Sequence, residues 1–177
     1  MRALVVYESM YGNTRRVAEA VAAGLDELSS VRVLSVADVK AADLEGCGLL
    51  VVGGPTHVHG MSRVSTRSSA ADVAAATGSL SMEPHADAGV RDWLATLAPV
   101  ESEVKAAAFD TRAEGPALLT GRASKGISDR LRKAGYAIVS EPESFTVSSE
   151  PAVGPDELER ARLWGILLAT KSEGNPV

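Results

Sequence analysis

Cysteine and long apolar runs are both scarce in this 177-residue sequence. The one cysteine, Cys47, cannot form an internal disulfide, which fits a reducing compartment, and we expect it to be a small buried hydrophobe at the start of a strand. No apolar run approaches the roughly 20 residues that a membrane helix needs, and the N-terminus does not resemble a secretion signal. We therefore expect a cytoplasmic protein without membrane insertion.

Three nucleotide- or phosphate-handling motifs are also missing. The absence of G-x-G-x-x-G argues against a dinucleotide-binding Rossmann site, and the absence of G-K-S/T argues against a nucleotide triphosphatase. A phosphoacceptor receiver domain needs an aspartate after the third strand and an acidic pair after the first. Here Gly53 and Gly54 stand at the former place, and Glu8 is the only acid at the latter. The formal net charge of -5 argues against a nucleic-acid partner.

What the sequence does contain is a regular alternation of strand-like and helix-like segments. We expect strands over 3–7, 31–36, 48–52 and 104–109, and a fifth strand split by Pro142 into 137–139 and 145–147. Helical spacing predicts helices over 17–28, 69–76, 90–97 and 127–135, and a last one beginning at Pro155. We interpret residues 78–89 as a surface loop. This alternation predicts an α/β domain over 1–177, with a parallel sheet covered by helices on both faces.

The turn after the first strand is the most informative segment. Its sequence, ESMYGNT over residues 8–14, offers hydroxyls, a glycine and backbone amides just before a helix. The first amides of a helix lack intrahelical acceptors and lie at the positive end of its dipole, so such a turn can hold an anion. Gly12 permits a positive φ or a close approach to a ligand. The turn therefore predicts a phosphate site that needs neither a metal nor a lysine.

Ligands of open parallel sheets bind beyond the carboxyl ends of the strands, where the strand order reverses. The turns after the first, third and fourth strands should therefore be considered together. They are ESMYGNT, the segment GGPTHVHGM over 53–61, and FDTR over 109–112.

These segments resemble the flavodoxin family. ESMYGNT is similar to its S/T-x-x-G-N-T phosphate loop, and GGPTHVHG is similar to its G-x-P-T-aromatic-x-x-G loop beside the flavin. The resemblance extends over the whole chain in the order of its elements. It implies a three-layer, flavodoxin-like sandwich whose five-stranded parallel sheet has the order 2-1-3-4-5. It also implies FMN, bound non-covalently, as the cofactor.

The resemblance assigns roles to three groups of residues. It implies phosphate contacts from Ser9, Met10, Tyr11, Gly12, Asn13 and Thr14. It implies flavin contacts from the second loop, by Pro55, Thr56, His57, Val58, His59 and Gly60, and from the third, by Asp110, Thr111 and Arg112. Tyr11 replaces a small hydroxyl residue of the family and is either an exposed ring or a lid on the phosphate or ribityl chain.

The two flavin loops depart from the family pattern. Shuttle flavodoxins stack a tryptophan and a tyrosine on the flavin, whereas the second loop here has His57 and His59, and the third has no aromatic residue after Phe109. Phe109 itself is expected in the core. His57 and His59 could bind a metal with His85, but no carboxylate or cysteine falls at ligand spacing, so we expect no metal. His57 beside the flavin could act as a proton donor.

Basic residues gather in or after the predicted loops at the cofactor end. They are Arg15, Arg16, Arg63, Arg67, Arg112, Arg122 and Lys125. Each by itself is an ordinary solvated side chain. Together they indicate a positive rim on an acidic protein, which would attract anionic substrates or partners.

Three functions follow from these patterns. The leading hypothesis is an FMN-binding electron-transfer protein that accepts electrons from a reductase and passes them to an acceptor protein. The alternative is an FMN-dependent oxidoreductase acting on a small anionic or quinone substrate, such as an NAD(P)H:quinone reductase or a porphyrinogen- or deazaflavin-linked enzyme. The basic rim and the missing stacking aromatics favour this alternative. The third is a flavin-free module of the same fold that binds a partner.

Overall fold

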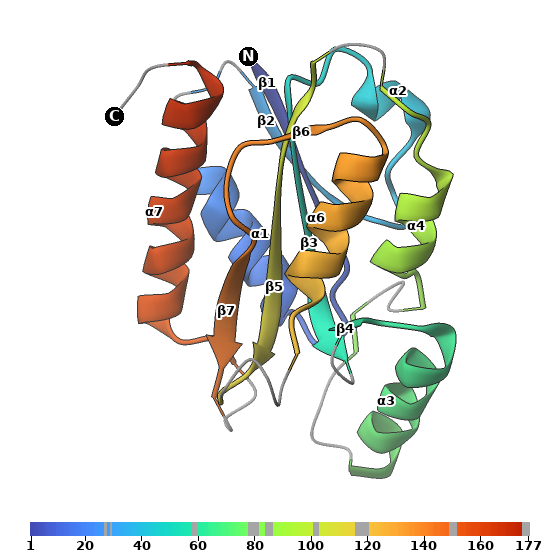
Figure 1. Cartoon of the computed structure of the whole chain (residues 1–177). Helices are drawn as coiled ribbons and strands as arrows, with labels where there is room; N and C mark the ends of the chain where they lie inside the picture. Colours follow the sequence, from blue (N-terminus) through green and yellow to red (C-terminus); the bar gives the residue numbers. More distant parts are fainter. Residues whose placement is uncertain are drawn as a thin grey trace.

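A computed structural model describes most of the chain (Figure 1). The described residues are 1–26, 28, 30–57, 60–77, 82–83, 87–100, 103–115, 121–148 and 152–174. The predicted loop over 78–89 therefore lies largely outside them.

One parallel sheet forms the centre of the molecule, with the strand order β2-β1-β3-β5-β6 and with β7 also paired to β5. Its strands are β1 (Arg2–Tyr7), β2 (Ser30–Ser35), β3 (Leu49–His57), β5 (Lys105–Ala113), β6 (Ala137–Ile138) and β7 (Glu143–Val147). Because β6 and β7 are the two parts of the split fifth strand, the predicted order 2-1-3-4-5 is confirmed. The short strand β4 (Gly60–Met61) pairs antiparallel with the end of β3 and was not predicted.

Helices cover both faces of the sheet, as predicted (Figure 1). On one face α1 (Asn13–Gly24) and α7 (Pro155–Ser172) pack over β1, β3 and β5. On the other lie α4 (Val90–Thr96) and α6 (Ala123–Lys133). Two more helices, α2 (Ala41–Leu44) and α3 (Val64–Thr77), lie in the part of the chain that the structure describes. The single turn of α2 was not predicted, and α3 begins before the predicted start at residue 69.

The central strands are longer than the sequence predicts. We expected ends at residues 52 and 109, but β3 continues to His57 and β5 to Ala113. The reason is tertiary: the two strands remain paired in parallel through Pro55 and Thr111, so ladder hydrogen bonds extend into segments that locally resemble loops. The predicted second and third loops are therefore partly strand ends, which hold their side chains more rigidly.

The core on the α1–α7 face is aromatic at one place and has two glycines at another. Phe109, Phe145 and Trp164 pack edge to face with ring centroids 6.1–6.2 Å apart, which confirms Phe109 as a core residue. A Cβ on Gly24 would lie 2.9 Å from the Gly165 Cα, so the two helix backbones are in direct contact. Cys47 is buried on the other face, as predicted.

Among the described residues, none of the helices has both the length and the apolar character needed to cross a membrane.

Candidate functional site

A pocket of about 330 Å³ lies where the carboxyl ends of β1, β3, β5 and β7 meet. Of the described residues it is lined by Ser9, Met10, Tyr11, Asn13, Thr14, Pro55, Thr56, His57, Thr111, Arg112, Ala113, Val147 and Ser148. The predicted segments therefore do come together. A larger cavity of about 410 Å³ lies near the start of β3 and β5, but its lining is mainly apolar and it lies away from the strand ends where ligands of such sheets bind.

The phosphate-type loop enters α1 through Gly12, which has φ 87° and is the N-cap residue. The first hydrogen bond of the helix runs from the Arg16 amide to the Gly12 carbonyl at 3.0 Å. The amides of Thr14 and Arg15 therefore come before the first i to i−4 hydrogen bond of α1. The Gly12 amide already donates to Ser9 Oγ at 3.1 Å. The turn therefore presents helix N-terminal amides and a hydroxyl at one place, as an anion site requires.

Thr14 joins this loop to β5. Its Oγ1 lies 2.7 Å from the Oγ1 of Thr111, and both residues are buried. One of the two hydroxyl protons is used in this bond, so the pair retains one O–H group to donate to a ligand. Two residues that the sequence places far apart thus act as one polar unit.

Asn13 has a structural contact as well. Its Oδ1 accepts a hydrogen bond from the Val153 amide at 3.0 Å, which fastens the segment before α7 to the start of α1. Because the side chain has this partner, an Asn13→Ala change affects the segment before α7 as well as the lining of the pocket. Tyr11 is half-exposed and lines the pocket.

The second predicted loop supplies one wall of the pocket from the end of β3. Thr56 Oγ1 accepts a hydrogen bond from the Ala123 amide at 2.9 Å, so its hydroxyl also supports the start of α6. His57 is half-buried at the last position of β3. Gly60 lies opposite His57 in β4 and lines an adjoining pocket instead. Val58 and His59 lie outside the described residues, as does His85.

The pKa of His57 lies below its usual value, because burial disfavours the charged imidazolium and the positive charge of Arg67 adds to this effect. At neutral pH the ring is therefore neutral, with one N–H donor and one acceptor nitrogen. A role for His57 as a proton donor would have to use that neutral N–H.

We expect this lowered pKa to appear in the stability of the protein. The folded state binds the proton more weakly than the unfolded state, so the free energy of unfolding falls as the pH drops below about 6.5 through the folded-state pKa. The His57→Gln variant should lose this part of the pH dependence. Urea unfolding of both proteins at pH 7.5 and 5.5 checks this. An imidazole NMR titration with a midpoint above 6.5 would contradict the expectation.

The third predicted loop is divided between the pocket and the core. Thr111 and Arg112 line the pocket, and Arg112 Nη1 also donates to the Gly115 carbonyl at 2.7 Å. Asp110 does not line the pocket: it is fully buried, and its Oδ2 accepts a hydrogen bond from the Ser124 amide at 2.7 Å. Asp110 thus caps the first turn of α6, where an acidic group also suits the helix dipole.

The one acid of the first loop, Glu8, points away from the pocket. Its side chain is buried, and Oε2 accepts a hydrogen bond from the Val90 amide at 2.8 Å. Burial raises the pKa of Glu8, while hydrogen bonds from Ser62 and Val90 oppose the shift. The described lining of the pocket contains no carboxyl group. The Glu83 carboxylate lies beside it, 3.1 Å from the place of a Cβ on Gly12, and is paired with Arg15 at 3.2 Å.

The ends of β5 and β7 add three lining residues that the sequence did not indicate, namely Ala113, Val147 and Ser148. They reach the pocket because β7 pairs in parallel with β5, with Ala113 opposite Val147. Hydrophobic pattern alone predicts neither the extension of β5 nor this register. A tendency of strands to continue beside a paired neighbour is the only signal that could have found them.

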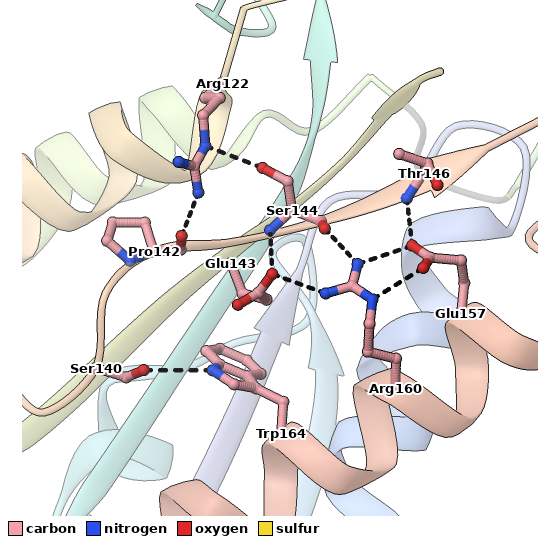
Figure 2. Close-up of polar contacts among 9 residues, drawn as sticks. All are labelled: Arg122, Ser140, Pro142, Glu143, Ser144, Thr146, Glu157, Arg160 and Trp164. Atoms are coloured by element: carbon pink, nitrogen blue, oxygen red, sulfur yellow. Dashed lines mark hydrogen bonds and ion pairs between the residues drawn. The ribbon is translucent and has the colours of Figure 1, made fainter. Parts of the chain in front are cut away.

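Side chains from α7, together with Arg122 just before α6, hold the outer edge of β7 in place (Figure 2). Arg160 Nη2 donates to the Ser144 carbonyl at 2.5 Å, and the Thr146 amide donates to Glu157 Oε2 at 2.6 Å. Arg160 also pairs with Glu157 and Glu143. The hydrogen bonds from Arg160 and from the Thr146 amide lower the pKa of Glu157. The backbone groups at this edge thus have partners, which positions Val147 and Ser148 at the pocket.

The predicted basic rim is only partly a set of free charges. Arg15 pairs with Glu83 at 3.2 Å and Glu19 at 3.7 Å. Arg67 is buried and pairs with Asp92 at 2.9 Å. Arg122 donates to Ser144 Oγ and to the Pro142 carbonyl, which positions its charge without neutralising it (Figure 2). The ion pairs of Arg15 and Arg67 leave fewer unpaired positive charges at this end of the sheet than the sequence indicates.

Comparison with known proteins agrees with this arrangement. The flavodoxin family model matches residues 5–82, which include the first two predicted loops. The resemblance to the flavodoxin family is thereby confirmed over this stretch. No curated protein matches the chain.

Solved structures share the fold over almost the whole chain. A flavodoxin from the domain Archaea has 21% identity and a TM-score of 0.66, covering 98% of this chain and 99% of its own. Flavodoxin 1 from Bacillus cereus has 18% identity and a TM-score of 0.63, with both chains fully covered. A WrbA-like flavodoxin from Agrobacterium tumefaciens has 20% identity and a TM-score of 0.63, covering 99% of each chain. The fold is therefore flavodoxin-like.

Proposed function

We propose that this flavodoxin-like chain binds FMN non-covalently and transfers electrons between a reductase and an acceptor protein. The observation that carries the proposal is the pocket at the strand ends. There a helix N-terminus and several hydroxyls meet a described lining that contains no carboxyl group. Such a site is built for a phosphate dianion joined to a larger, partly apolar group.

The residues present fit FMN on three counts. The volume of about 330 Å³ falls in the range of small-molecule sites, which begins at roughly 300 Å³. Gly12 adopts a φ of 87°, which an L side chain rarely adopts, at the turn that the phosphate would approach. The donors are hydroxyls, amides and one arginine, all of which can hydrogen-bond to phosphate oxygens.

Residues from several strands and from α1 would bind FMN together. Ser9, Thr14 and the first amides of α1 would bind the phosphate, while Pro55, Thr56 and His57 would line one side of the ring. Thr111 and Arg112, with the ends of β5 and β7, would complete the pocket. When bound, FMN supplies the capacity to carry one or two electrons. The protein orients it and surrounds it with neutral or positive groups.

A second function, direct oxidation or reduction of a small substrate, is favoured by one observation. A separate pocket rich in arginine adjoins the proposed flavin pocket and shares His57 with it. A carrier that only docks other proteins has no need of such a pocket.

The test is a titration of purified protein with FMN, followed by its visible spectrum and by quenching of flavin fluorescence. We expect binding with a Kd in the micromolar range or tighter, because several charge-assisted hydrogen bonds of about 1.5–3 kcal/mol each converge on the phosphate. Absence of binding at millimolar FMN would refute the proposal and leave the flavin-free module. Oxidation of NAD(P)H with a quinone, without added reductase, would favour the second function over the first.

A further inference from the structure

The pocket beside His57 has the chemistry of a second anion site. It measures about 350 Å³, and of the described residues it is lined by His57, Gly60, Met61, Arg63, Ser65, Thr66 and Arg91. Every charged side chain among these is an arginine. His57 lines this pocket and the proposed flavin pocket alike, so occupants of the two pockets would both lie beside this residue.

Arg91 is positioned without being neutralised. Its Nε donates to the Ser62 carbonyl at 3.0 Å and its Nη2 to the Met61 carbonyl at 2.9 Å. Among the described residues no carboxylate forms an ion pair with Arg91 or with Arg63. Burial lowers the pKa of Arg91, and the nearby positive charges of Arg130 and Arg63 lower it further. Two guanidinium groups without a carboxylate partner can both donate to one bound anion.

The two neighbouring carboxyl groups, those of Asp92 and Glu8, do not form an ion pair with Arg91. Asp92 is paired with Arg67: Arg67 Nη2 donates to Asp92 Oδ2 at 2.9 Å. Glu8 is buried, and burial raises its pKa. Both carboxyl groups favour the charged form of Arg91, but they rank below burial and the two arginines among the influences on it.

The start of α3 adds neutral donors to the same pocket. The Arg63 amide donates to Thr66 Oγ1 at 2.8 Å, and the first helical bond runs from the Arg67 amide to the Arg63 carbonyl at 2.9 Å. The amides of Ser65 and Thr66 therefore precede the helical hydrogen bonds of α3, and both residues line the pocket. Arginine forks, a hydroxyl and helix N-terminal amides together are the donors that recognise a phosphate group.

We propose that this basic pocket, defined by Arg63, Ser65, Thr66 and Arg91, binds the phosphate group of a small organic reactant that meets the flavin at His57. The part of the inference that concerns the flavin rests on the proposed binding of FMN and on the second proposed function, the direct oxidation or reduction of a small substrate. The evidence for the anion site itself is the two arginines and the start of α3. The proposal narrows the substrate class to phosphorylated organic molecules.

The test is calorimetric titration of FMN-saturated protein with pyrophosphate and, separately, with ADP. Arg63 is exposed, so Arg63→Ala should fold normally. We expect it to weaken pyrophosphate binding about tenfold to a hundredfold, because a charge-assisted contact is lost. Arg162→Ala removes the same charge from an exposed position on α7, on the other face of the sheet, and should leave binding within about twofold.

The outcomes separate the anion site from its role beside the flavin. Tighter binding of ADP than of pyrophosphate, lost in Arg63→Ala, supports the whole proposal. Equal affinity for both probes assigns the pocket to the inorganic anion and overturns the organic reactant. Equal losses in Arg63→Ala and Arg162→Ala, or no pyrophosphate binding, overturn the site. If the protein takes up no FMN, the same titrations on Thr14→Val and Arg63→Ala still decide whether anions bind here or at α1.

Discussion

Replacing Gly165 by alanine is expected to lower the free energy of unfolding by about 3 kcal/mol or more. A Cβ at this position in α7 would overlap the Val21 carbonyl oxygen and lie 3.0 Å from the Gly24 Cα in α1. Both obstacles are backbone atoms, so no rotamer change can relieve the clash, and the two helices would have to separate. The intrinsic helix preference of alanine, worth about 1 kcal/mol over glycine, offsets only part of this cost. Urea unfolding followed by circular dichroism measures it.

Gly154→Ala provides the matched control for this experiment. Gly154 precedes α7, has an ordinary φ of -71°, and a Cβ there would meet nothing within 4 Å. We expect its stability to change by less than about 0.5 kcal/mol. Gly24→Ala should be as harmful as Gly165→Ala, but the double variant should cost less than the sum, because one separation of the helices relieves both clashes. A tolerated Gly165→Ala would mean that α1 and α7 are not in backbone contact.

Thr14→Val is expected to weaken FMN binding about tenfold to a hundredfold, while riboflavin affinity changes by about twofold or less. The variant keeps the shape of the side chain and removes the hydroxyl that we place at the phosphate. Riboflavin lacks the phosphate, so it does not make the lost contact. The measurement is fluorescence quenching with each flavin, together with urea unfolding to show that the variant is folded. Equal weakening of both flavins would contradict the assignment.

The hydrogen bond between Thr14 and Thr111 makes the companion variant informative. Because the two hydroxyls lie 2.7 Å apart, we expect Thr111 to donate to Thr14 and Thr14 to donate to the phosphate. Thr111→Val should then weaken FMN less than Thr14→Val does. The double variant should be no worse than Thr14→Val, because the two hydroxyls act in series. Additive losses would mean that each hydroxyl contacts the ligand independently.

Local pattern was sufficient to predict a parallel sheet covered by helices on both faces and the loop at α1, whereas the strand order was implied by the family resemblance. The apolar run 3–7, the amphipathic helix after it and the turn of residues 8–14 all depend on neighbours in the sequence, so propensity and periodicity describe them well. Gly12 illustrates this: a glycine before the helix permitted either a positive φ or a close approach to a ligand, and the structure has the positive φ. The interruption at Pro142 likewise predicted a divided fifth strand, because proline cannot donate to a ladder.

The tertiary structure decided three further features. These are where the strands end, which groups hydrogen-bond to the buried acids, and which arginines are paired with a carboxylate. Ala113 and Val147 reach the pocket only because β5 and β7 stay paired, and Asp110 turns inward because α6 begins beside it. The sequence by itself determined the main strands and helices and indicated the turn before α1 as a candidate anion site, since both follow from short-range chemistry. Only the folded chain decided which charges remain unpaired, because neutralising Arg67 and leaving Arg63 and Arg91 available requires residues that are far apart in sequence.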